Sequence, residues 1–72
     1  MEIINLTANG YKRLKKQIAK ELAKGHTEEA AYILIYADSY LTTPRFNYLS
    51  KIIKEYKGTK AQRQRLKRWA NY

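Results

Sequence analysis

Apolar residues recur along three parts of the chain at the three- and four-residue spacing of amphipathic helices. These segments cover about residues 8–24, 44–57 and 60–70. On a helical wheel each segment carries one apolar stripe and an opposite arc of Lys, Arg and polar residues. The stripes are Tyr11, Leu14, Ile18 and Leu22; Phe46, Leu49, Ile52, Ile53 and Tyr56; and Gln62, Leu66, Trp69 and Ala70.

A further segment, residues 27–40, is apolar nearly all round. A helix without a polar side is covered by neighbours on most of its surface. The pattern therefore predicts that this segment is the central helix of the fold or lies in a dimer interface.

Residues that favour helix ends separate the four segments. Thr7, Thr27, Thr43 and Thr59 are candidate N-caps, Pro44 suits a first helical position, and Gly25 and Gly58 suit left-handed C-terminal positions. The linkers between segments are short, and a chain of 72 residues has apolar surface for one core only. The sequence predicts one all-α domain over residues 1–72, a compact bundle of about four short helices.

The N-terminal segment "MEIINLT" predicts either an apolar arm that packs on this bundle or a short strand. A strand followed by two helices would resemble the ribbon-helix-helix arrangement, in which two chains pair their strands. The alternative fold is therefore a ribbon-helix-helix-like dimer with extra C-terminal helices.

Charge narrows the class of partner. The chain carries 15 Lys and Arg against 6 Asp and Glu, which gives a net charge of +9. The only charged residues within 25–43 are acids. Polyanions are the natural partners of such a chain. Abundant Lys, Ile and Asn also accompany AT-rich coding sequence, which accounts for part of the charge.

The sequence lacks the residues that several classes of function require. With no Cys and one His, the chain predicts no disulfide, metal site or other cofactor. No His, Ser and acid combination suggests catalysis, so we expect a protein that is not an enzyme. No membrane-spanning run or signal peptide is recognisable, and the expected compartment is the cytoplasm.

The last predicted helix, residues 60–70, is a candidate nucleic-acid-binding element. Leu66 and Trp69 would dock it on the body of the protein, leaving cations outside that suit phosphate oxygens. Basic residues of the first predicted helix would extend this binding surface. The candidate residues are Lys60, Arg63, Arg65, Lys67 and Arg68, with Lys12, Lys16 and Lys20.

A helix-turn-helix is a second candidate, formed by "ADSYLTTPRFNYLSKIIK". Residues early in the second helix of that motif contact base edges. Here those residues are Arg45, Asn47, Ser50 and Lys51, followed by Lys54. The alternative is an ordinary helix-helix corner.

Tyr32, Tyr36 and Tyr40 recur every four residues. We expect core packing with hydroxyls at the rim rather than stacking on unpaired bases. His26 is expected to be a loop residue.

The leading hypothesis is a small non-enzymatic nucleic-acid-binding protein, with DNA preferred to RNA as the partner. The alternative is a protein-interaction module or inhibitor of the phage or mobile-element type, which docks on an acidic protein surface. A homodimer is compatible with either.

Overall fold

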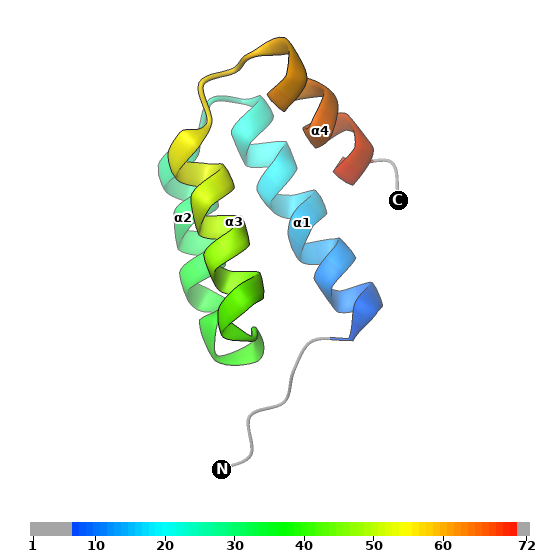
Figure 1. Cartoon of the computed structure of the whole chain (residues 1–72), viewed down its shortest axis with the longest axis vertical. Coiled ribbons are helices and arrows are strands. Elements are labelled where there is room, and N and C mark those ends of the chain that lie inside the picture. The colour runs from blue at the N-terminus through cyan, green and yellow to red at the C-terminus, as the bar shows by residue number, and fades with distance from the viewer. Residues whose placement is uncertain (1–6, 71–72) are drawn as a thin grey trace.

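Four α-helices and one 3-10 helix form the part of the chain described by the computed structural model, residues 7–70. In chain order they are α1 (Ala8–Ala23), α2 (Thr27–Tyr36), η1 (Asp38–Tyr40), α3 (Thr43–Glu55) and α4 (Lys60–Ala70). Figure 1 shows α2 and α3 side by side as an antiparallel pair, with α4 against α1. The all-α bundle of about four helices is confirmed. The predicted arm or strand, residues 1–6, lies outside the described residues.

The central helix is α1, because it packs against both α2 and α4 and buries more residues than any other described helix. Ile18 and Leu22 on α1 are completely buried, whereas α2 buries only Ala30 and Leu34. Of the two predictions for residues 27–40, a central helix covered by its neighbours is therefore wrong, and a place in a dimer interface stays a prediction. A bundle this small covers one side of α2 and leaves its other apolar side chains exposed.

The core is built from the apolar stripes read in the sequence. α1, α3 and α4 bury most of their stripe residues, and Tyr11, Phe46 and Tyr56 pack partly buried against them. The buried side chains are Leu14, Ile18, Ala19, Leu22, Ala30, Leu34, Leu41, Leu49, Ile52, Ile53, Leu66 and Trp69. Among the described residues no polar or charged residue is buried, so apolar burial holds the helices together.

Helix ends follow the sequence closely at α1. The Thr7 hydroxyl accepts a hydrogen bond from the Gly10 amide at 3.1 Å, which confirms the predicted cap. After α1 and after α3, Gly25 and Gly58 have φ of 79° and 76°, the left-handed conformation that favours glycine.

Two other predicted caps are wrong by one residue. α2 begins at the His26 carbonyl, which accepts from the Ala30 amide, so His26 rather than Thr27 is the N-cap. The N-cap of α3 is Thr42 rather than Thr43, because the Thr42 carbonyl accepts from the Phe46 amide. Neither cap residue forms a side-chain cap hydrogen bond. The sequence offered two adjacent threonines before Pro44, and the backbone hydrogen bonds select the first.

α2 ends at Tyr36 rather than near Tyr40, because the chain tightens into a 3-10 turn. Its hydrogen bonds join the Tyr40 amide to the Ala37 carbonyl and the Leu41 amide to the Asp38 carbonyl. Leu41 then takes an extended backbone and is buried in the core. Burial of Leu41 therefore accompanies the change of direction that starts α3.

The side chain of Gln62 joins the end of α3 to the start of α4. Its Oε1 accepts from the amides of Lys57 at 2.7 Å and Thr59 at 3.2 Å, and its Nε2 donates to the Glu55 carbonyl at 2.8 Å. The Gln62 amide in turn donates to the Thr59 hydroxyl at 3.3 Å. The Thr59 and Gln62 pair is a capping box, which confirms the predicted cap of α4.

Replacing Gln62 with Ala should lower the free energy of unfolding by about 1–2 kcal/mol, because three backbone groups lose their side-chain partner at the solvent-facing linker. Urea denaturation measures this loss, and amide exchange should accelerate at Lys57 and Thr59. Gln64→Ala, on the exposed side of the same helix, is the matched control. Equal stability of the two variants would contradict this role for Gln62.

Candidate nucleic-acid interface

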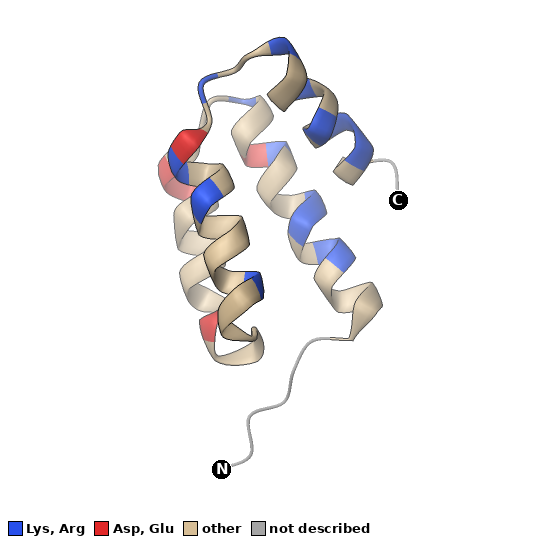
Figure 2. Ribbon diagram, viewed as in Figure 1, with Lys and Arg blue, Asp and Glu red and all other residues tan. Residues whose placement is uncertain are grey.

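α1 and α4 bring their cationic sides next to one another. The side of α1 away from the core carries exposed or half-buried Lys12, Arg13, Lys16 and Lys20. Three of these residues and Asn9 line a shallow hollow of about 380 Å³ on this helix. Figure 2 shows basic residues along α1 and α4. Arg13 was absent from the candidate residues, although the helical wheel places it on the same arc.

A groove of about 250 Å³ separates the two helices. Ala19 and Ala23 of α1 line it together with Leu66 and Ala70 of α4. Three cations also line it: Lys20 from α1, and Arg63 and Lys67 from α4. The groove thus has an apolar part of small side chains and is bordered by positive charge on both helices.

The position of α4 depends on Leu66 and Trp69, which are buried as predicted. The Lys15 ammonium of α1 lies 5.6 Å from the centroid of the Trp69 ring and 5.0 Å from that of Tyr11. From α3, the Tyr48 ring lies tilted to Trp69 with 6.5 Å between centroids. Trp69 therefore contacts both neighbouring helices, which fixes how α4 presents its cations.

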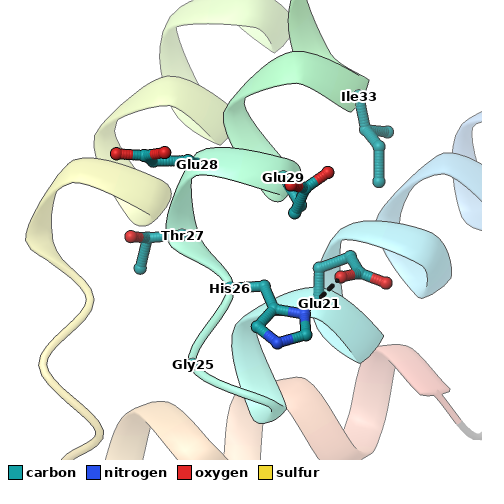
Figure 3. A pocket seen from close by; sticks show the side chains of 7 residues that line it. All are labelled: Glu21, Gly25, His26, Thr27, Glu28, Glu29 and Ile33. Atoms are coloured by element: carbon teal, nitrogen blue, oxygen red, sulfur yellow. Dashed lines mark hydrogen bonds and ion pairs between the residues drawn. The ribbon is translucent and has the colours of Figure 1, made fainter.

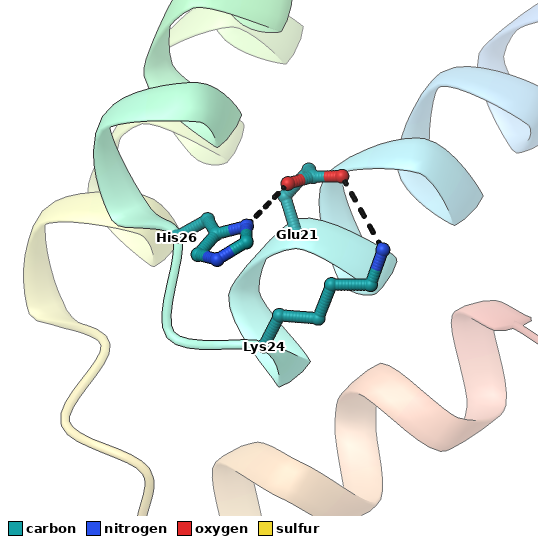
Figure 4. A network of polar contacts seen from close by, with 3 residues as sticks. All are labelled: Glu21, Lys24 and His26. Atoms are coloured by element: carbon teal, nitrogen blue, oxygen red, sulfur yellow. Dashed lines mark hydrogen bonds and ion pairs between the residues drawn. The ribbon is translucent and has the colours of Figure 1, made fainter.

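The acids of the described chain lie elsewhere. Figure 2 shows them at the two ends of the α2 and α3 pair, apart from one on α1. That one is Glu21, whose carboxylate oxygens lie 3.0 Å from His26 Nδ1 and 4.0 Å from Lys24 Nζ (Figure 4). Neither the α1 hollow nor the α1–α4 groove is lined by an acid. The electrostatic potential at both features is therefore positive.

The corner between α1 and α2 forms a more polar hollow of about 610 Å³, lined in part by Glu21, His26, Glu28 and Glu29. Figure 3 shows the Glu28 carboxylate pointing away from His26 and Glu21. Within residues 7–70 no three His, Cys, Asp or Glu side chains are placed to hold a metal ion. His26 lies in the connection between helices, as expected.

Of the residues proposed for a helix-turn-helix, Arg45 lies apart from the others, which share the outer side of α3 at helical spacing. The Arg45 guanidinium lies 4.5 Å from the centroid of the Tyr11 ring, so it stacks within the protein. Ser50 and Lys54 line a hollow between α2 and α3, while Asn47 and Lys51 are exposed. Figure 1 shows α2 and α3 as an antiparallel pair, and the helix-turn-helix and the ordinary helix-helix corner both stay predictions.

The fourth helix divides its cations between its sides. Arg63 and Lys67 line the groove with α1, whereas Arg65 is half-buried on another part of the helix surface. Lys60 and Arg68 are exposed and line neither hollow on α1. Lys20 thus meets Arg63 and Lys67 of α4 at the groove, the α1 hollow holds three other cations of α1, and no cation of α3 lines either feature.

The expectation that the tyrosine stripe packs in the core is wrong. Tyr32, Tyr36 and Tyr40 are 56%, 82% and 48% exposed. Tyr32 and Tyr36 share one side of α2, whereas Tyr40 lies in η1 beyond the end of the helix. Spacing does not say which side of a helix meets the core.

No protein-family model matches this chain, and neither curated proteins nor solved structures give a match. The candidate interface therefore rests on geometry alone. None of the helices in residues 7–70 has the length and apolar character needed to cross a bilayer.

Leu66→Ala should lower the free energy of unfolding by about 2–5 kcal/mol, because it leaves a cavity between α4 and α1. Trp69 is the sole tryptophan of the chain and is buried, so its emission should shift to longer wavelength as α4 loosens. Denaturation followed by this emission measures both effects. Arg68→Ala, at an exposed position of the same helix, should change the free energy of unfolding by less than about 0.5 kcal/mol. If Leu66→Ala and Arg68→Ala lowered stability equally, the docking role of Leu66 would be contradicted.

Proposed function

We propose that this protein binds double-stranded DNA through the basic surface formed by α1 and α4. The observation that supports this most is the groove where Lys20, Arg63 and Lys67 come together from two helices. Arg13 and Lys16, with Lys12, continue the positive surface along α1. No acid lines either feature, so the surface has a positive potential that attracts an external anion.

Phosphate contact accounts for the chemistry of this surface. Lysine offers a compact charge, and the Arg63 guanidinium offers a planar fork that matches phosphate oxygens. Each phosphate that the surface neutralises releases counterions from the duplex, so association weakens as salt rises, with a slope of about −0.9 per phosphate. Contacts of this kind position a protein on DNA and carry no base identity. Binding is accordingly expected to tolerate many sequences.

The composition of the surface favours a duplex over a single strand. Proteins that bind single strands stack unpaired bases on aromatic side chains. The residues that line the α1 hollow and the α1–α4 groove include no aromatic residue. A surface of charges and small aliphatic side chains suits a regular phosphate backbone instead.

The test is fluorescence anisotropy of a short mixed-sequence DNA duplex titrated with the full chain over a range of salt concentrations. Replacing Lys20, Arg63 and Lys67 together with Gln should weaken binding by roughly tenfold or more. The same variant should have a shallower salt slope, by about 0.9 for each phosphate that the protein no longer neutralises. Absence of binding to the duplex at low salt would overturn the proposal.

A matched variant distinguishes binding by the α1–α4 surface from binding that depends only on the net charge of the protein. Replacing Lys51, Lys54 and Lys57 with Gln also removes three positive charges, here from exposed positions on α3 and just after its end. This variant should bind several-fold more tightly than the groove variant. Equal losses of affinity would mean that total charge, rather than the α1–α4 surface, governs association. Duplex RNA and single-stranded DNA in parallel titrations test the preference for duplex DNA.

A further inference from the structure

The outer side of α2 carries an apolar surface that the fold leaves uncovered. Tyr32, Ile35 and Tyr36 are 56%, 59% and 82% exposed, and Tyr40 in η1 is 48% exposed. We name these four residues the α2 patch. Figure 1 shows α2 at the side of the bundle away from α4, so the patch is separate from the α1–α4 surface. We propose that the α2 patch is the interface of a homodimer, in which it packs against the same patch of a second copy.

Charge favours a second copy as the occupant. Residues 25–44 contain no Lys or Arg and three acids, Glu28, Glu29 and Asp38, in a chain of net charge +9. Docking through basic surfaces would place like charges of the two copies together, whereas docking through α2 keeps those surfaces apart. Nucleic acid is repelled by the acids beside the patch. A symmetric contact through α2 therefore opposes fewer like charges than one through the α1–α4 surface.

The shape of this side also suits self-association. Tyr32 and Tyr36 stand four residues apart and form a ridge along α2. On one flank, Leu14, Ile33, Ala37 and other residues line a hollow of about 350 Å³ between α2 and α1. On the other flank a mainly aliphatic hollow of about 270 Å³ lies between α2 and α3. An interface with two-fold symmetry needs a projection and a recess on the same surface, and the α2 side supplies both.

The area of the patch sets the strength of the dimer. With roughly 150–250 Å² for each fully buried aromatic side chain, the exposed fractions leave on the order of 400–500 Å² on each copy. A standard stable interface buries about 800 Å² per partner, so the patch supports a weak dimer. We expect monomer to prevail at low concentration and dimer to form as the concentration rises.

Sedimentation equilibrium of the full chain, from low micromolar to near-millimolar concentration, tests the proposal. The average mass should rise towards twice the monomer mass as concentration increases. Tyr36→Glu should raise the dissociation constant at least tenfold, since it buries a charge in the interface. Because Tyr36 is 82% exposed in the monomer, the variant should retain its helical circular dichroism. Ile35→Glu provides a second variant with the same expected result.

Gln64→Glu is the matched control, because Gln64 is exposed on α4 outside the patch and the substitution introduces the same charge. It should dimerise like the unmodified chain. Monomer at every concentration would overturn the proposal, and so would a dimer that persists in both α2 variants. Added salt should leave an apolar dimer intact or strengthen it, whereas DNA binding should weaken. The two proposals therefore fail independently: a monomer can bind DNA, and a dimer through α2 can lack DNA affinity.

Discussion

The packing of α4 against α1 is the contact on which the proposed interface depends. Leu66 and Trp69 contribute most of the apolar burial of a short helix whose remaining surface is strongly cationic. Full burial of such side chains stabilises by about 1.5–3 kcal/mol each. The same contact holds Arg63 and Lys67 beside Lys20, a juxtaposition of like charges that self-repulsion opposes. Apolar packing thus maintains an electrostatic arrangement that would not form by itself.

Two local features help this packing to select one position. Gln62 bonds the end of α3, the linker and the first turn of α4, so α4 has a defined starting point. At the other end of the helix, Trp69 contacts Lys15 and Tyr48 through its ring. Small side chains on α1, Ala19 and Ala23, allow the helices to approach and leave the shallow groove between them. Polar capping and apolar docking therefore act on the same helix from opposite ends.

The molecule separates its surfaces by chemistry. Positive charge lies along α1 and α4 and at a few positions of α3, and acids other than Glu21 gather near the ends of the α2 and α3 pair. The exposed apolar residues of the α2 patch lie on α2 and η1. A basic surface is suited to a polyanion, while an apolar surface with acids beside it is suited to a protein. Association through α2 would leave both basic surfaces of a dimer open to solvent. The two proposed contacts are thus compatible in one molecule.

The sequence by itself determined the elements and most of the core. Periodic apolar residues identified α1, α3 and α4 with their buried sides, and Thr7, Gly25, Gly58 and Thr59 located helix ends, because these signals act through local geometry. The exposed side of α2 and the central position of α1 could not be read, because an all-round apolar helix has no preferred side until its neighbours are placed.

The grouping of charged residues was likewise decided by the tertiary structure. The sequence offered cations on three helices as one candidate set, but packing brings Lys20 together with Arg63 and Lys67, sets Arg45 against the Tyr11 ring, and leaves Lys51 and Lys54 exposed on α3. A helical wheel gives each residue an angle about its own axis. Which angles face one another depends on how the axes pack, and that is set by long-range apolar contacts.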